Sequence, residues 1–109
     1  MTECIFCKII KKELPSKIIY EEGDFLAFQD INPVAPVHLL IIPKKHIPSA
    51  DHLEEHDKEL VGGLFLFAKK ITKKNGLNKT GYRLIFNVGP DAGQTVEHLH
   101  LHLLSGKIL

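Results

Sequence analysis

The sequence contains no tryptophan, one methionine and only two cysteines among its 109 residues. The sequence also has no large excess of charge of either sign, because 14 basic side chains are balanced by 13 acidic ones and the formal net charge is +1. A nucleic-acid-binding protein needs a strongly basic face, so we expect no nucleic-acid partner. Two cysteines only three positions apart do not favour a structural disulfide, which predicts a reducing, cytoplasmic location.

Long hydrophobic runs are also missing. The longest apolar stretches, VHLLIIP and LVGGLFLFA, are far shorter than the roughly 20 residues that a membrane-spanning helix needs. The first residues, MTECIFCKII, do not have the basic segment and long apolar run of a secretory signal. We therefore expect neither a membrane partner nor a secretory signal.

The remaining composition is that of a folded protein, with 44% hydrophobic and 25% charged residues. We expect one domain, residues 1–109, whose modest core would gain stability from oligomerisation. A short helix in CIFCKIIKKE ends before Pro15, and the β-rich runs SKIIYEE and FLAFQD form a hairpin around EGD. Further strands are expected in VHLLII, GYRLIFNV and EHLHLHLL. With one long helix, these runs predict an α+β fold with a mostly antiparallel sheet of about five strands.

The long helix is expected to begin at Asp51, because Glu54 follows three residues later and completes a capping box. It should end near Gly76, after a run of lysines that suits the negative end of the helix dipole. Its middle, LFLF, is apolar around most of the circumference, which indicates burial on more than one side. One side would face the sheet and the other a second subunit, unless one or two phenylalanines are simply exposed. Apolar residues at helical spacing are Leu53, Leu60, Leu64, Phe67 and Ile71.

Histidine occupies every second position in EHLHLHLL, at 98, 100 and 102. Side chains alternate between the two faces of a strand, so the leucines would pack under the long helix and the histidines would share the other face. Three interpretations are a polar strand face, a metal site and a catalytic site. At about 3.3 Å per residue the outer histidines lie roughly 13 Å apart, too far for one ion to hold all three. Catalysis is favoured because neutral imidazole is a good nucleophile, and the preceding loop, GPDAGQT, offers backbone N–H groups to an anion.

HLHLHLL resembles the signature of the histidine-triad (HIT) superfamily. CIFCKII, SKIIYE, FLAFQDINP, HLLIIPKKHI and GLNKTGYRLIFNVGPDAGQTVEHLHLHLL resemble HIT segments in the same order. The chain is most similar to the Hint branch, whose members hydrolyse nucleoside phosphoramidates and related adenylates. Thr95 stands where Hint proteins usually carry serine, and GQT is more similar to the Fhit branch, which cleaves dinucleoside polyphosphates. Both activities stay open, as does a nucleotide-binding regulatory protein with little turnover.

The resemblance also implies roles for individual residues. His100 would attack the α-phosphorus of a purine nucleotide such as an AMP derivative and form a nucleotidyl-histidine. His102 and Thr95 would contact the phosphate and assist the leaving group, and His38 would be a further pocket histidine. Asp30 would bind the ribose hydroxyls, although alone it is typical of an Asx turn before a proline. Implied nucleotide contacts are Ile5, Phe6, Ile9, Phe28, Ile31 and Leu40 at the base, and Asn87, Gly93, Gln94, Thr95 and Val96 at the ribose and phosphate.

Cys4 and Cys7 allow three interpretations. They are two buried thiols, a redox pair, or half of a closed zinc site. The redox interpretation is not favoured, because the sequence around the two cysteines lacks the βαβ pattern in which redox C-x-x-C motifs usually occur. Many bacterial HIT proteins carry two cysteines and two histidines as a zinc set, which here would be completed by His46 and His98. The resemblance therefore implies one structural zinc that ties the first helix to the sheet, and it also implies a homodimer formed partly by continuation of the sheet.

Overall fold

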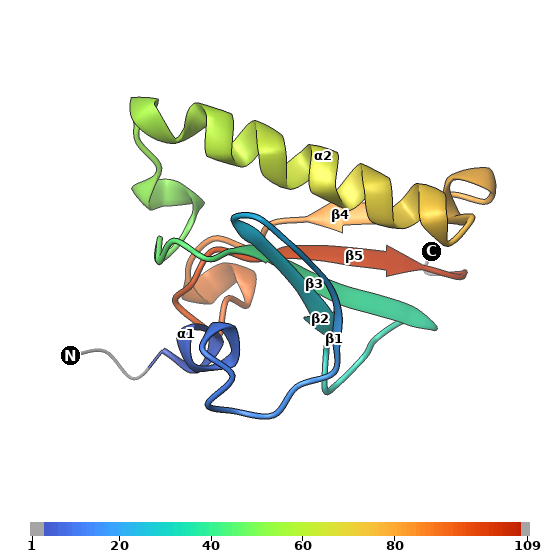
Figure 1. Ribbon diagram of the computed structural model, residues 1–109, viewed down its shortest axis with the longest axis horizontal. Helices are drawn as coiled ribbons and strands as arrows, with labels where there is room; N and C mark the ends of the chain where they lie inside the picture. Colours follow the sequence, from blue (N-terminus) through green and yellow to red (C-terminus); the bar gives the residue numbers. More distant parts are fainter. Residues whose placement is uncertain (1–3, 108–109) are drawn as a thin grey trace.

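The computed structural model describes residues 4–107 and places a long and a short helix on opposite faces of one sheet (Figure 1). The strand order is β1-β2-β3-β5-β4, and every neighbouring pair is antiparallel. The expected α+β fold is therefore confirmed. No helix in the described residues is long and apolar enough to cross a membrane. The elements are α1 (Ile5–Ile10), β1 (Ile18–Glu22), β2 (Phe25–Gln29), β3 (Val37–Pro43), α2 (Lys58–Lys74), β4 (Arg83–Ile85) and β5 (Leu101–Ser105).

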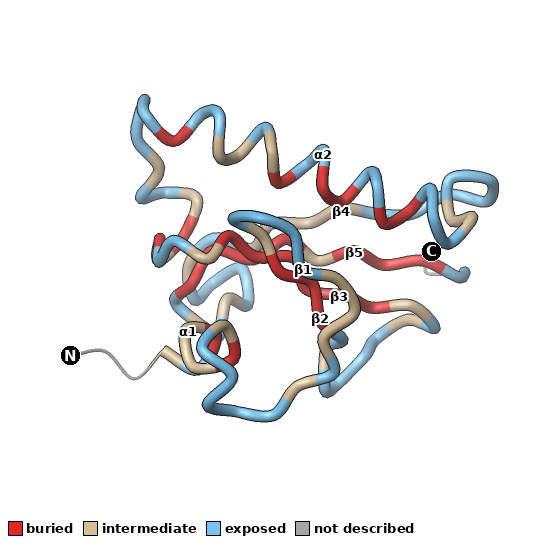
Figure 2. Tube along the Cα trace, in the orientation of Figure 1, coloured by how far each residue is buried: buried red, intermediate tan, exposed pale blue. Residues whose placement is uncertain are grey.

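The sheet is buried on both faces in its middle, which explains the unbroken apolar run along β3 (Figure 2). Because side chains alternate along a strand, Leu39 and Ile41 pack towards α2, whereas Leu40 and Ile42 pack towards α1. The α2 core consists of Ala27, Leu39, Ile41, Leu64, Phe67, Ala68, Ile71, Leu101 and Leu103. The smaller α1 core consists of Phe6, Ile9, Leu26, Phe28, Leu40 and Ile42.

The predicted start of the long helix is wrong. Two separate 3₁₀ turns, Ala50–His52 and Glu55–Asp57, precede α2, which begins at Lys58. The Ser49 side chain accepts a hydrogen bond from the Asp51 N–H (3.2 Å) and closes the first turn. Asp57 is buried, accepts from the Glu54 N–H (3.0 Å) and pairs with Lys45 (2.7 Å), so the capping box lies three residues later than expected. The expected end is confirmed, since Gly76 follows α2 with a left-handed φ of 69°.

The last two strands are shorter than predicted. Only Arg83–Ile85 of the expected run forms β4, and β5 begins at Leu101. Pairing of β5 with β3 ends at Leu101 and Ile41, because beyond this point the chain pairs with the loop after β3. The Leu99 N–H donates to the Ile47 carbonyl (2.6 Å) instead of joining the sheet. Leu101 and Leu103 do pack under α2 as expected, but two of the three alternating histidines lie before the strand.

Candidate functional site

A pocket of about 460 Å³ opens beside α1, on the face of the sheet away from α2. Its floor is apolar and comes from α1, β2 and β3, and one side carries the end of the histidine segment. Eleven of the residues predicted to contact a nucleotide line it: Ile5, Phe6, Ile9, Phe28, Asp30, Ile31, Leu40, Thr95, Val96, His100 and His102. The lining also includes five residues for which no ligand contact was predicted: Leu14, Pro15, Ser16, Gln29 and Asn32. None has a side chain whose type alone indicates a binding role, so only the folded chain shows that they face the pocket.

His100 presents one ring nitrogen to this pocket in a defined protonation state. Its Nδ1 lies 2.7 Å from the carbonyl oxygen of His98. A carbonyl only accepts, so Nδ1 carries the proton and Nε2 keeps its lone pair. Burial lowers the pKa of His100, against the opposing effects of the His98 carbonyl and Asp30, which favours the neutral ring. Phe6 packs edge-on against the ring with centroids 5.2 Å apart and restricts its orientation. The His100 ring is therefore held neutral, with a lone pair on Nε2.

His102 and His38 form a hydrogen-bonded pair whose direction is also fixed. The Val34 N–H donates to His38 Nδ1 (3.2 Å), so the proton of the neutral His38 ring is on Nε2. His38 Nε2 then donates to His102 Nδ1 at 3.0 Å. His102 consequently carries its own proton on Nε2. Burial, followed by the charges of His100 and His38, lowers the pKa of His102 to about 4. Nε2–H of a neutral His102 is thus available to a bound oxygen.

Asp30 lines the pocket and makes one contact with the backbone and one with a side chain. Its Oδ1 accepts from the Asn32 N–H (2.8 Å), as in the Asx turn that the residue type predicts. Its Oδ2 lies 3.3 Å from His38 Nε2. The carboxylate also lines the pocket, so the turn and a ligand contact are compatible. The remaining acceptor capacity of an ionised carboxylate suits a pair of hydroxyl groups.

Asp30, His38 and His102 bring potential metal-ligating atoms within 4.8 Å of one another. The hydrogen bonds argue against a metal there. A metal on His38 Nε2 would move the ring proton to Nδ1, where it would face the Val34 N–H. Two donors cannot share that contact, and the arrangement is better explained as a chain of hydrogen bonds.

The loop between β4 and β5 is held by the side chain of Gln94. Its Oε1 accepts from the Gly89 N–H (2.9 Å), and its Nε2 donates to the carbonyls of Pro48 (2.8 Å) and Val96 (3.0 Å). Gln94 and Gly93 therefore do not line the pocket, and their N–H groups are used within the loop. Across residues 4–107, by contrast, the N–H groups of Thr95 and Val96 have no hydrogen-bond partner. This loop consequently presents two neighbouring donors where Thr95 and Val96 meet the pocket.

Asn87 and His38 lie behind the pocket rather than in its lining. The amide nitrogen of Asn87 is 3.4 Å from His102 Nε2. Both atoms are donors in the protonation state derived above, so this distance marks proximity rather than a hydrogen bond. Asn87 is therefore a direct neighbour of His102 Nε2.

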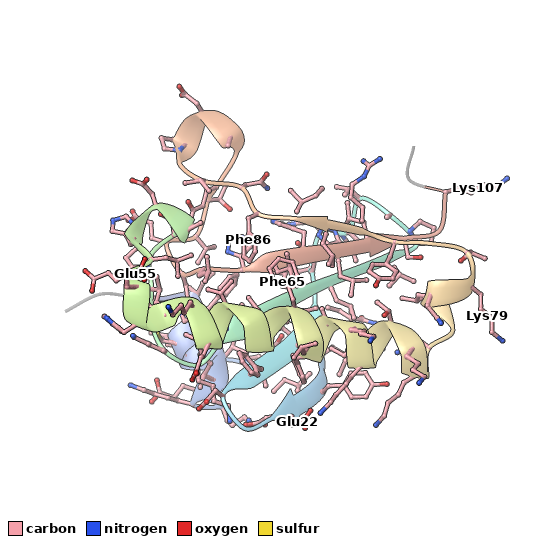
Figure 3. The ribbon with its side chains drawn as sticks, turned by 90° about the horizontal axis from the view of Figure 1, so that it is seen from above. Glu22, Glu55, Phe65, Lys79, Phe86 and Lys107 are labelled. Carbon is pink, nitrogen blue, oxygen red and sulfur yellow. The ribbon has the colours of Figure 1, made fainter. Side chains whose placement is uncertain are left out.

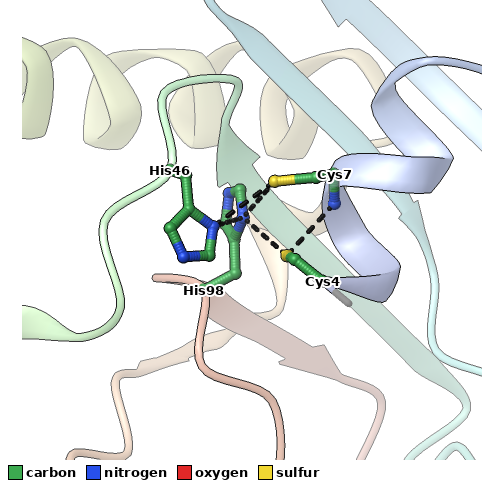
Figure 4. Close-up of side chains that lie close together, drawn as sticks. All are labelled: Cys4, Cys7, His46 and His98. Atoms are coloured by element: carbon green, nitrogen blue, oxygen red, sulfur yellow. Dashed lines mark hydrogen bonds between the residues drawn. The ribbon is translucent and has the colours of Figure 1, made fainter. Parts of the chain in front are cut away.

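A second cluster joins four residues from distant parts of the chain (Figure 4). Cys4 and Cys7 lie at the start of α1, His46 in the loop after β3, and His98 before β5. His98 Nδ1 is 3.4 Å from Cys4 Sγ and 3.2 Å from His46 Nδ1, and Cys7 Sγ is 3.3 Å from His46 Nδ1. Tetrahedral zinc with bonds of about 2.0–2.3 Å separates its ligand atoms by roughly 3.3–3.8 Å. The four predicted residues are therefore spaced to hold one such ion.

The surroundings of this cluster also fit a metal. His98 is fully buried and its Nε2 donates to the Pro43 carbonyl (2.8 Å), which directs the lone pair of Nδ1 into the cluster. Burial lowers the pKa of His98 to about 4, so the ring is neutral. Burial and the neighbouring Cys4 raise the pKa of Cys7 to about 11, so metal binding must displace the thiol proton. Both cysteines are free thiols.

Known proteins resemble this chain in both sequence and fold. The HIT domain family model matches residues 11–108. A histidine triad protein from Clostridium difficile is 46% identical, with a TM-score of 0.95 over 100% of this chain and 95% of that one. A HIT family hydrolase from Clostridium thermocellum is 50% identical, with a TM-score of 0.92 over 97% and 92% of the two chains. A histidine triad nucleotide-binding protein from Candida albicans is 35% identical, with a TM-score of 0.85 over 97% and 78%.

These matches extend over nearly the whole chain, and the family model includes the histidine segment and the loop before it. Most of the residues that the resemblance singled out line one pocket or form one Cys–His cluster. The chain belongs to the HIT domain family.

Proposed function

We propose that the protein is a nucleotide hydrolase that cleaves purine nucleoside phosphoramidates or related adenylates at the α-phosphate. The observation that carries this proposal is His100, whose protonated Nδ1 is bound to the His98 carbonyl while Nε2 is left as a nucleophile beside the pocket. The histidine triad nucleotide-binding protein and the HIT family hydrolase among its relatives support the same class of reaction.

The reaction would proceed in two displacements. His100 Nε2 forms a bond to the α-phosphorus as the bond from phosphorus to the leaving nitrogen breaks. The leaving nitrogen takes up a proton from solvent through the Thr95 hydroxyl. Water then displaces the histidine from the nucleotidyl-histidine, releases one proton and gives the nucleoside monophosphate. The His98 carbonyl stabilises the positive charge of the intermediate, because it accepts from Nδ1.

Charge on the phosphoryl oxygens would be stabilised by fixed donors. His102 supplies Nε2–H, since its Nδ1 already accepts from His38. Thr95 and Val96 supply backbone N–H groups that have no other partner among the described residues. His102 therefore acts as an oriented donor to the phosphate in this scheme.

The remaining pocket would hold the nucleoside. Asp30 would accept hydrogen bonds from both ribose hydroxyls, and the purine would lie in the apolar part of the pocket between α1 and the sheet. Apolar walls with few polar groups are typical of small-ligand sites. The apolar part consists of Ile5, Phe6, Ile9, Phe28, Ile31 and Leu40.

Phosphoramidates are favoured over dinucleoside polyphosphates because of the charge around the pocket. Among the described residues, no lysine or arginine lines it. A polyphosphate leaving group carries several negative charges that would need cationic partners. Glu97, near the loop that holds Thr95, would instead repel it. An amine leaving group has no such requirement.

We further propose that Cys4, Cys7, His46 and His98 hold a structural zinc, which the spacing and second hydrogen bond of His98 support. Zinc would join α1, and with it one wall of the pocket, to the loop after β3 and to the histidine segment. Its reduced cysteines suit a cytoplasmic protein.

We propose that residues 1–109 form one domain and that this domain dimerises. α2 exposes Phe65 and Leu66, with 41% and 62% of their surface accessible. Phe65 meets Phe86, just after β4, with ring centroids 6.0 Å apart (Figure 3). β4 is an edge strand of the sheet. An exposed apolar helix face beside a free strand edge favours pairing with a second copy that continues the sheet.

The test is rapid quenching of the reaction with adenosine phosphoramidate labelled in the phosphate. Label should appear on the peptide that contains His100. His100→Asn should abolish labelling and turnover while AMP still binds, because an asparagine amide can replace Nδ1 as donor to the His98 carbonyl but has no counterpart of Nε2.

His56→Asn is the matched control, since His56 is exposed and does not line the pocket. Near-normal turnover of His100→Asn would refute the nucleophile. Tight AMP binding by the wild type without turnover of a panel of phosphoramidates would favour a regulatory nucleotide-binding protein.

A further inference from the structure

The Cys–His cluster and the nucleotide pocket share a single peptide unit. The His98 side chain belongs to the cluster, while its carbonyl oxygen accepts from His100 Nδ1 at 2.7 Å. The next N–H, that of Leu99, donates to the Ile47 carbonyl at 2.6 Å, one residue after the cluster's His46. No strand pairing holds this peptide, because β5 begins only at Leu101. Its position therefore depends on the groups that bind His98 and its neighbours.

The helix α1 makes a second connection. Cys4 is its N-cap residue, and the Cys4 sulfur accepts from the Cys7 N–H at 3.2 Å. Between the two cysteines lies Phe6, whose ring packs edge-on against both His98 (5.9 Å) and His100 (5.2 Å). The same helix contributes Ile5, Phe6 and Ile9 to the pocket lining. A change in how Cys4 and Cys7 are held must therefore reach the wall of the pocket.

We propose that occupation of the Cys4–Cys7–His46–His98 cluster by a divalent metal and occupation of the pocket by a nucleotide strengthen each other, with His98 as the positioning residue between them. Metal bound to His98 Nδ1 fixes the peptide that orients His100, and metal bound to the two cysteines fixes α1 against the base. The cluster is thus a determinant of nucleotide affinity as well as of stability. This inference rests on the proposed nucleotide binding.

Coupling of this kind is reciprocal in binding free energy. If metal raises the affinity for AMP by some factor, AMP must raise the affinity for the metal by the same factor. Typical couplings between sites are about 5–150-fold. Two contacts carry the coupling here, the bond between His98 and His100 and the packing of Phe6, so we expect at least a fivefold effect in both directions.

The experiment uses the full chain and a variant with weakened metal affinity. His46→Gln removes the exposed ligand and leaves Cys4, Cys7 and His98, which are the ligands linked to the pocket through α1 and the His98 carbonyl. His56→Gln is the matched control for the same chemical change at an exposed site outside the cluster. AMP binding is measured by calorimetry with chelator and with saturating zinc, and zinc binding is measured by chelator competition with and without AMP.

We expect AMP to bind His46→Gln at least fivefold more tightly with zinc than with chelator, and zinc to bind at least fivefold more tightly with AMP. Equal AMP affinity within twofold in both conditions, with unchanged circular dichroism, would overturn the coupling. Absence of AMP binding in either condition would instead reject the proposed function.

A second measurement tests the coupling without removing the metal, for the case in which the metal-free chain unfolds. Wild-type protein is loaded with Co²⁺, whose absorption bands report the geometry of a tetrahedral Cys–His site. AMP at saturation should shift these bands, because the nucleotide contacts α1 and His100 and both are linked to the ligands. Bands that stay unchanged while AMP is bound would overturn the proposal, since the two sites would then be independent.

Discussion

The bond from His38 to His102 can be tested with a pair of substitutions that separate the two nitrogens of the His38 ring. Asparagine places its side-chain amide near the position of Nδ1, whereas glutamine reaches the position of Nε2. His38→Asn should keep the acceptor for the Val34 N–H and lose the donor to His102 Nδ1. His38→Gln should keep a donor to His102 and lose the acceptor for Val34.

The size of the expected decrease in kcat follows from the loss of one hydrogen bond of 3.0 Å between the two imidazoles. Such a bond contributes about 0.5–1.5 kcal/mol, which corresponds to roughly a 2- to 12-fold decrease in kcat at about 1.4 kcal/mol per tenfold. His38→Asn should show this decrease because His102 is no longer held with its proton on Nε2. His38→Gln should remain within about twofold of wild type. The lost acceptor matters little, because Val34 is 75% exposed and water can replace it.

The assay is steady-state turnover of adenosine phosphoramidate, with thermal unfolding as the check on folding. The decrease in kcat of His102→Ala is the upper limit for the His38 variants, since removal of an oriented donor to a transition-state oxyanion lowers kcat by about 10²–10³. Equal decreases in His38→Asn and His38→Gln would refute the assigned direction of the bond. A decrease in His38→Asn as large as that in His102→Ala would show that His38 does more than orient its neighbour.

Four further outcomes are expected. Because burial lowers the pKa of His100, its neutral form and the Nε2 lone pair persist as the pH falls, and the acid limb of kcat/KM should lie below the ordinary histidine value; a limb at pH 6.5 or above would contradict this. Leu103→Ala should destabilise the fold by about 2–5 kcal/mol in chemical denaturation, since Leu103 is completely buried under α2. Metal analysis should find about one zinc per chain, and Cys4→Ala should lower both zinc content and melting temperature while some activity remains. Phe65→Glu should shift sedimentation from dimer towards monomer, whereas a wild type that is monomeric at micromolar concentration would remove the proposed interface.

The order and type of the main elements were predictable because their signals are local. Alternation and apolar runs identified β1, β2 and β3, and helical spacing identified α2. The start of α2 was not predictable in this way, since two capping boxes compete within a few residues. The second one prevails because Asp57 is buried and paired with Lys45, a partner from the loop after β3. That contact exists only in the folded chain.

The site was predicted as a set of residues but not as a network. The resemblance singled out His100, His102, His38 and Asp30, and the structure places three of them in the lining of one pocket, with His38 in contact with His102 and Asp30. The resemblance did not show which nitrogen of each histidine ring is protonated. Those assignments depend on backbone groups that carry no sequence signature, such as the N–H of Val34 and the carbonyl of Pro43. Any residue type at position 34 other than proline offers the same N–H.

The shortness of β5 is what gives the three alternating histidines different chemistry. A strand that continued back to Glu97 would place all three side chains on one face and would pair their backbone with β3. Because pairing stops at Leu101, the His98 carbonyl is free to accept from His100 Nδ1, and the His98 ring turns to the Pro43 carbonyl and the cysteines. Only His102 lies within the ladder, opposite Leu40, and its ring meets His38 from β3. The alternation in the sequence therefore marks the site, while the end of the ladder turns His98 to the cysteines, leaves His100 bound to the His98 carbonyl and pairs His102 with His38.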